Sequence, residues 1–189
     1  MAKQTLNGIN TGLGKIYYSV IKNGDYQTPV ELGDLISFTV TPTENSVELW
    51  AGDRQVVIDS AVAVEGSFVV PAVSNENLAT LFGMERGQKD ELIYSSKAVR
   101  PEVALLIRQN NYGGVSDDIT LYRCRLTLAG LQGNTKTESL TFGQKEFAFK
   151  CLLDEDGVYM SVSSSDESNY NGDTFFTNVP TKPIPQPGQ

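Results

Sequence analysis

The sequence predicts a mainly β fold: an antiparallel β-sandwich or open barrel with one short packing helix and extended N- and C-terminal arms. Runs of about five to ten residues rich in Val, Ile, Thr, Phe and Tyr are separated by glycine and short polar clusters. Within the clearest runs apolar and polar residues alternate, as in strands that bury one face. Because turns rather than helices connect these runs, antiparallel strands are favoured over a parallel sheet.

The length of the chain fits one domain. Its 189 residues, of which 40% are hydrophobic and 20% charged, have an ordinary globular balance. We expect an N-terminal arm at 1–13, a single β domain at 14–179 and a C-terminal tail at 180–189. The tail holds four of the eight prolines and is expected to be extended and weakly structured.

The first predicted strands lie at 15–21 and 35–41. Asn23 and Gly24 follow the first strand and predict a tight turn, because both residues tolerate a positive φ. Pro42 is expected to end the second strand, since proline has no N–H to donate to a neighbouring strand.

A long hairpin is predicted in the next part of the chain. Two strand-like runs, 46–51 and 54–64, are separated by Gly52 and Asp53 alone. A further short strand is expected at 66–70.

One helix is predicted over about 74–83. Ser74 suits the N-cap, and Gly83 suits the position after the last helical residue. Leu78, Leu81 and Phe82 share one apolar face. A helix this short is marginal alone, so it must pack against the sheet.

The later strands carry the two cysteines. Cys124 and Cys151 fall on the apolar faces of two strongly alternating runs. We expect two buried thiols that act as small hydrophobes, and nothing in the sequence supports the alternative of a redox pair. Two of these later strands, 91–97 and 103–109, come before a predicted loop at 110–114. The strands predicted after that loop are 119–129, 136–142, 144–153, 158–163 and a short one at 174–179.

Composition narrows the possible functions. The net charge is −8, with 15 basic and 23 acidic residues, so tight binding of nucleic acid is not expected. The absence of histidine excludes Ser-His-Asp and Cys-His catalysis and histidine-based zinc sites. We expect no signal peptide, and no apolar stretch of the sequence is long enough to cross a membrane. We expect no cofactor, no metal and no catalytic residue.

Two local patterns resemble ligand sites in composition alone. The glycines at 8, 12 and 14 precede Lys15, but their spacing does not match a phosphate-binding loop and a strand follows instead of a helix. The segment 166–173 is acidic, but Tyr170 and Asn171 occupy positions where an EF-hand needs an oxygen ligand and glycine. A flexible arm and a solvated polar loop are the favoured interpretations.

Paired carboxylates are the remaining candidates for chemistry. Asp53 with Asp59, or Asp117 with Asp118, would suit a glycosidase only if a cleft separated them. Nothing in the sequence brings them across a cleft, so we expect solvated turn residues.

A few aromatic and charged residues are candidate contacts between subunits. Trp50, the only tryptophan, falls on the polar face of its strand, where it serves either as an interface anchor or as a residue packed under a neighbouring loop. The full candidate set is Trp50, Asp53, Arg54, Tyr17 and Tyr112.

Several short motifs follow one another between about residues 12 and 163. They are KIYY at 15–18, YQTPVEL at 26–32, the strand at 35–41, ELWAGD at 48–53, LFG at 81–83, PEVALLIR at 101–108, LYRCRLTL at 121–128 and TESLTFGQKEFAFK at 137–150. Together they resemble the major tail protein, or tail tube protein, of long non-contractile-tailed phages, in particular siphophages of Gram-positive hosts. One departure from that family is Gly52, inserted between Ala51 and Asp53.

This resemblance implies a structural protein rather than an enzyme. Six subunits would close into a ring, and rings would stack into a tube that conducts DNA and contains the tape-measure protein. Partners would be further copies of the chain, the tape-measure protein and other tail proteins, with DNA passing through an acidic lumen without tight binding. The protein would be assembled in the cytoplasm of the bacterial host and reside in the virion tail.

Two alternatives remain open at this point. One is another ring-forming component of a virion or secretion tube, such as a tail terminator. The other is a β-sandwich hydrolase or carbohydrate-binding domain, which would need a concave cleft with convergent carboxylates or aromatic side chains.

Overall fold

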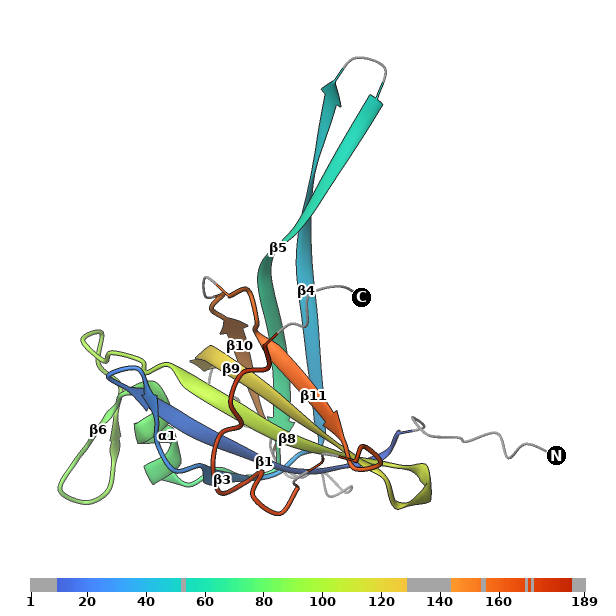
Figure 1. Cartoon of the computed structure of the whole chain (residues 1–189). Coiled ribbons are helices and arrows are strands. Elements are labelled where there is room, and N and C mark those ends of the chain that lie inside the picture. The colour runs from blue at the N-terminus through green and yellow to red at the C-terminus, as the bar shows by residue number, and fades with distance from the viewer. Residues whose placement is uncertain are drawn as a thin grey trace, which may run out of the picture.

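The computed structural model describes residues 10–51, 54–128, 144–153, 156–168, 170 and 172–184, with the backbone alone at 44–51, 54–62 and Leu128. The fold is mainly β, with antiparallel strands and one α-helix among the described residues, as predicted (Figure 1). The strands are β1 (Asn10–Lys22), β2 (Asp25–Tyr26), β3 (Val30–Asp34), β4 (Ser37–Ala51), β5 (Arg54–Val70), β6 (Glu85–Arg86), β7 (Leu92–Ile93), β8 (Val103–Asn111), β9 (Ser116–Leu128), β10 (Lys145–Cys151) and β11 (Met160–Ser164).

A single large sheet runs in the order β2-β1-β8-β9-β10-β5-β4, with β3 paired to β1 and β11 paired to β9. The bend between β3 and β4 connects the two ends of this sheet. Leu35 N donates to Gly14 O of β1, and Ile36 N donates to Val69 O of β5. The chain therefore passes directly from one edge of the sheet to the other, which gives an open barrel, one of the two architectures that the sequence left open.

The hairpin of β4 and β5 has two parts. Residues 37–43 pair with 63–69 at the base, and a bulge at Thr43 and Glu44 separates this base from the projecting part, 44–51 with 54–61. The projecting part extends far beyond the rest of the barrel (Figure 1). At about 3.3 Å per residue, eight paired residues span roughly 26 Å.

Pro42 does not end its strand, contrary to expectation. It lies within β4, opposite Val64. Because β4 is the last strand of the sheet, it has a neighbour on one side only and tolerates a residue without an N–H.

The core lies inside the curled sheet and beneath the helix α1 (Asn75–Phe82). Ser74 Oγ accepts a hydrogen bond from Asn77 N, and Gly83 adopts a left-handed conformation with φ of 61°, as the capping pattern predicted. The ring of Phe147 stacks between those of Phe68 and Phe82, with centroid distances of 5.2 and 5.9 Å. Both cysteines are buried in this core, as expected.

The outer face of β1, β8 and β9 is covered by the C-terminal segment 165–184, whose described residues cross it in turns and irregular backbone (Figure 1). Five consecutive residues of β8, Val103–Ile107, are fully buried, so both faces of that strand are covered. Phe175 of the segment is buried, and Phe176 stacks on Tyr17 with 4.3 Å between ring centroids.

Several predicted boundaries are wrong. β1 begins at Asn10, so 10–13 pair with β8 instead of belonging to the arm. Only Leu92–Ile93 of the predicted strand at 91–97 is extended and paired, with the short β6. The predicted strand at 174–179 consists of turns. Its aromatic side chains pack on the face of the sheet, so the segment does not pair with the edge of the sheet as a strand would. The predicted strand at 136–142 lies outside the described residues.

Candidate assembly surface

The outer edge of β4 is the first candidate surface for assembly. Among the described residues no strand pairs with this edge, because β4 ends the sheet. Unpaired N–H and C=O groups on an edge strand form a template for a strand of another chain. Thr41 on this strand is exposed and lies opposite Glu65, whose carboxylate is 3.2 Å from Lys150 Nζ. The edge therefore continues a polar, solvent-facing surface of the sheet.

Exposed apolar side chains lie on β3, at the bend before β4, and in the connection between β7 and β8. Val30, at the start of β3, and Ile36, at the bend between β3 and β4, are each 44% exposed. Tyr94 and Val99, between β7 and β8, are 54% and 83% exposed. Apolar groups of this size in water favour contact with another molecule when they are gathered in one region.

The predicted contact residues fall into three groups. Tyr112 lies in a 3-10 turn between β8 and β9 and is 57% exposed, so it is available to a partner. Tyr17 makes contacts within the subunit: its ring stacks on Phe176 and its hydroxyl donates to Glu31 Oε2 at 2.9 Å. Trp50 and Arg54 lie near the end of the projecting hairpin, where the structure describes the backbone alone.

The fifth candidate, Asp53, lies outside the described residues. Ala51 and Arg54, the nearest described residues on either side in the sequence, pair with each other. Thus two of the five candidates, Trp50 and Arg54, belong to the projecting part of the hairpin that the structure describes.

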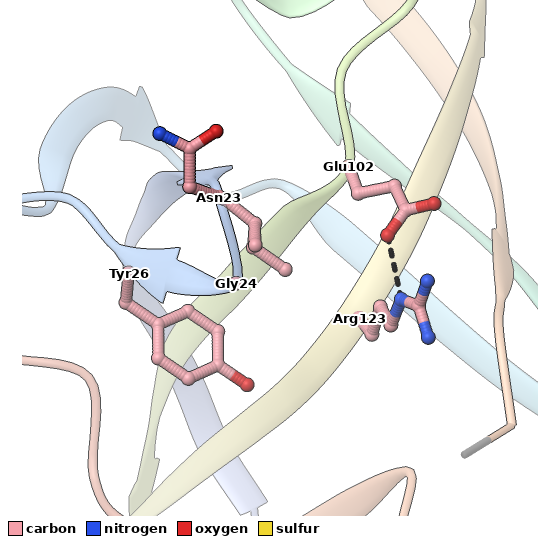
Figure 2. A pocket seen from close by; sticks show the side chains of 6 residues that line it. Asn23, Gly24, Tyr26, Glu102 and Arg123 are labelled. Atoms are coloured by element: carbon pink, nitrogen blue, oxygen red, sulfur yellow. Dashed lines mark hydrogen bonds and ion pairs between the residues drawn. The ribbon is translucent and has the colours of Figure 1, made fainter.

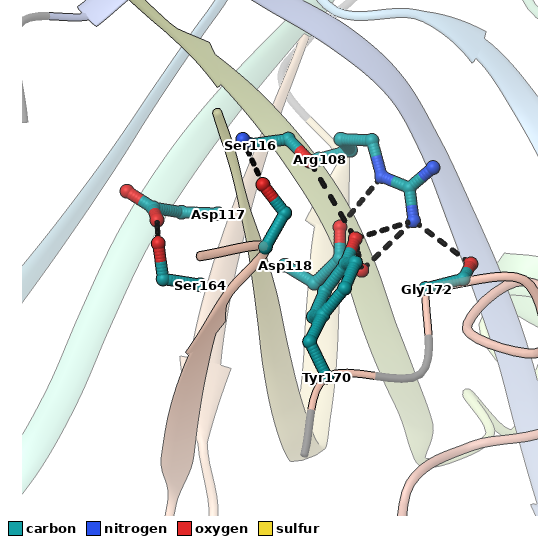
Figure 3. Close-up of polar contacts among 8 residues, drawn as sticks. Arg108, Ser116, Asp117, Asp118, Ser164, Tyr170 and Gly172 are labelled. Carbon is teal, nitrogen blue, oxygen red and sulfur yellow. Dashed lines mark hydrogen bonds and ion pairs between the residues drawn. The ribbon is translucent and has the colours of Figure 1, made fainter. Parts of the chain in front are cut away.

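A polar cluster around Arg108 fastens the C-terminal segment to the barrel (Figure 3). Arg108 Nε and Nη2 donate to Asp118 Oδ1 and Oδ2 at 2.6 and 2.8 Å. Nη2 also donates to Gly172 O at 3.0 Å, and the Tyr170 hydroxyl donates to Asp118 Oδ2 at 2.7 Å. The guanidinium carbon lies 4.8 Å from the centroid of the Phe176 ring, a cation–π distance. One arginine thus joins β8, β9 and the C-terminal segment.

The pKa values in this cluster are shifted by its hydrogen bonds, its charges and its partial burial. The hydrogen bond with Asp118 and the nearby negative charge raise the pKa of Arg108, in spite of partial burial. Burial, together with the hydrogen bond to Asp118, raises the pKa of Tyr170. Arg108 therefore remains a cation and Tyr170 a neutral donor at neutral pH, the states in which all these bonds form.

Sequence reasoning missed this cluster. It treated Asp117 and Asp118 as solvated turn residues, but both lie in β9 and the Asp118 side chain is only 1% exposed. The two carboxylates do not converge, because successive residues of a strand point to opposite faces. Asp117 instead accepts hydrogen bonds from Asn111 Nδ2 and Ser164 Oγ. A signal was present in the sequence, since Arg108 continues the face of Ala104 and Leu106.

A cavity of about 450 Å³ lies beside the turn between β1 and β2 (Figure 2). The carboxylate of Glu102 accepts hydrogen bonds from Arg123 Nε at 2.5 Å and Arg125 Nη2 at 3.0 Å. The hydrogen bond from Arg123 and the charges of both arginines lower the pKa of Glu102. A carboxylate held ionised in this way is a poor proton donor. The lining residues are Ile21, Asn23, Gly24, Tyr26, Glu102 and Arg123.

Two kinds of feature are absent from the part of the chain that the structure describes. No group of three or more His, Cys, Asp or Glu side chains is placed to hold a metal ion there. No helix within these residues has the length and apolarity to span a membrane.

Comparison with known proteins adds no family to these observations. No protein-family model matches the chain, and no curated protein matches it significantly in sequence.

Proposed function

We propose that this chain is the structural subunit of a phage tail tube, which closes into rings that stack into a conduit for DNA ejection. The proposal rests on the motifs that resemble major tail proteins and on one structural observation. That observation is the hairpin of β4 and β5, whose projecting part leaves the barrel next to an open sheet edge.

The open edge supplies the ring contact. A strand edge that is unpaired in one subunit can be completed by backbone groups of the next, and repetition of this contact around an axis closes a ring. Ile36 lies at the bend beside the edge and would be buried by the same neighbour. The resemblance implies six subunits in each ring.

The projecting hairpin supplies the contact between rings. A two-stranded ribbon in isolation is marginally stable in water, so packing against another surface would stabilise it. A projection of roughly 26 Å is long enough to reach a neighbouring subunit outside the plane of the ring. Trp50, Asp53 and Arg54 are the residues proposed to make that contact.

The net charge of −8 suits a conduit for DNA. Negative charge on the wall of a tube repels phosphates, so DNA passes without being held. In this proposal the partners are other copies of the chain, the tape-measure protein and other tail proteins. The chain acts in the virion tail by assembling, without catalysis and without a cofactor.

Negative-stain electron microscopy of the purified chain over a range of concentrations and salts tests the proposal. Long open-ended tubes of uniform diameter are the expected result. Single closed rings that never stack would favour the alternative of a tail terminator or similar component. Monomers at every concentration and salt would contradict both.

A further inference from the structure

The two cysteines of the chain face each other across neighbouring strands. Cys124 of β9 lies directly opposite Cys151 of β10, and their sulfur atoms are 3.3 Å apart. Both are free thiols and both are buried. In the sequence they are 27 positions apart, and the sequence alone does not show that they meet.

The strand register gives this pair the geometry of a cross-link. Leu152 N donates to Arg123 O, so residues 123 and 152 form a hydrogen-bonded pair. Pairs alternate along an antiparallel ladder, and the adjacent pair, Cys124 with Cys151, is therefore a non-hydrogen-bonded one. The Cα atoms of such a pair lie about 4.5 Å apart, inside the range of about 4.4–6.8 Å that disulfides span.

A cross-link at this position in the barrel would join two parts of the sheet. β10 lies between β9 and β5, and it is the strand through which the hairpin of β4 and β5 is attached to β1, β8 and β9. A covalent bond between β9 and β10 would fasten the two halves of the sheet at this junction. The loop that it closes includes the 129–143 connection, and closing such a loop restricts the unfolded chain.

We propose that Cys124 and Cys151 are a reversible dithiol–disulfide pair that closes when the folded protein meets a small peroxide oxidant. Hydrogen peroxide oxidises one thiol to a sulfenic acid and releases one water. The second thiol then attacks the sulfenic sulfur, the S–S bond forms, and the hydroxyl leaves as a second water. In sum, two thiols lose two electrons and two protons, and one peroxide becomes two waters. This inference does not depend on the proposed function.

Burial determines how fast the pair can react. The reactive species is the thiolate. The hydrogen bond between the two thiols raises the pKa of Cys124 and lowers that of Cys151, so Cys151 is the thiol that ionises more readily. Burial of both sulfur atoms limits the access of the oxidant, so the pair should react slowly while the protein stays folded. Mild urea, which promotes local opening, should accelerate closure.

The test is oxidation of the reduced full-length chain with hydrogen peroxide, followed by unfolding in the presence of an alkylating agent and measurement of the intact mass. The expected product has no thiol left to alkylate, is about 2 Da lighter than the reduced chain, and returns to the dithiol on treatment with dithiothreitol. Its melting temperature should exceed that of the reduced chain by roughly 5–15 °C.

Two controls make the result specific. Cys124→Ala and Cys151→Ala each retain one thiol, so neither can lose about 2 Da by this route, and neither should gain melting temperature on oxidation. Because slow access to a buried pair could limit the reaction, the reduced chain is also refolded in a glutathione redox buffer. Two alkylatable thiols after both treatments would overturn the inference. Sulfinic or sulfonic products, or chains joined to one another, in place of the internal disulfide would also overturn it.

Discussion

The guanidinium of Arg108 donates to both carboxylate oxygens of Asp118, with Nε–Oδ1 and Nη2–Oδ2 distances of 2.6 and 2.8 Å. The Asp118 side chain is only 1% exposed. Two parallel hydrogen bonds to a carboxylate fix both its charge and its orientation. The same guanidinium also contacts Gly172 and Phe176, so the pair connects the barrel to the C-terminal segment.

Arg108→Met should lower the free energy of unfolding by about 3–5 kcal/mol, because it leaves the Asp118 carboxylate buried without its cation. Urea unfolding at neutral pH measures the loss. Arg86→Met is the matched control, since its ion pair with Asp90 is exposed and should be worth less than about 1 kcal/mol. Adding Asp118→Asn to Arg108→Met should recover part of the loss. Equal small losses in both single variants would contradict this account of the pair.

Gly66→Ala should destabilise the barrel by about 1–3 kcal/mol or more, because a Cβ there would overlap the Thr39 carbonyl oxygen and the Phe149 ring. Thermal melting checks the loss. Gly12→Ala on β1 is the control, because nothing lies within 4 Å of the added carbon, and it should change stability by no more than about 0.5 kcal/mol. If the two variants have the same melting temperature, the close packing at Gly66 is not as described.

Acid should destabilise the protein partly through Glu102. Since folding lowers the pKa of Glu102 below its ordinary value of 4.5, the unfolded chain binds more protons in that range and stability rises with pH. This contribution is present above about pH 4.5 and is lost as pH falls through the folded pKa. The free energy of unfolding of Glu102→Gln, measured with urea from about pH 7 to pH 3, should therefore fall less steeply with acid than that of the unaltered chain. An equally steep fall in both proteins would exclude this role for Glu102.

Thr41→Lys should weaken assembly without harming the subunit. The new lysine lies opposite Glu65, which offers it an ion pair, but it places a charge at the edge that a neighbouring subunit would cover. We expect a rise of about tenfold or more in the concentration needed for assembly, equivalent to about 1.4 kcal/mol. Light scattering at increasing concentration measures it.

Ala148→Lys is the control for that experiment. Ala148 is exposed but lies on β10, which is paired on both sides, so a lysine there blocks no free edge. It should assemble as the unaltered chain does. Equal inhibition by both lysines would mean that surface charge, and not the β4 edge, controls assembly.

Local patterns in the sequence predicted much of the fold. The helix was predicted because Ser74 and Gly83 are capping residues that act within their own turn. The turn after β1 was predicted because Asn23 and Gly24 both take positive φ values, 54° and 89°. The apolar faces that carry Cys124 and Cys151 were also correct, since alternation with period two depends on neighbouring residues alone.

Features that depend on which strands are neighbours were not predictable in this way. Pro42 is tolerated because β4 is an edge strand, which is a property of the sheet and not of the segment. Tyr170 lies in a segment of polar composition, yet its hydroxyl lies within hydrogen-bonding distance of Arg108 and Asp118. The candidate surface was predicted only as far as the long hairpin, while the open edge beside it emerged from the strand order.

The central claim, that this chain functions by stacking through its hairpin, is tested most directly by shortening that hairpin. Replacing 44–62 with Asn-Gly would join Thr43 to Ala63, which already pair, through a two-residue turn. The buried residues of the hairpin base, Val64, Phe68 and Val70, are retained, so the barrel should fold.

Sedimentation velocity of the full and shortened chains at matched concentrations is the decisive measurement. The full chain should form large species that grow with concentration, while the shortened chain should form nothing larger than a closed ring. Assembly of the shortened chain into equally large species, or a full chain that sediments only as a monomer, would contradict the claim.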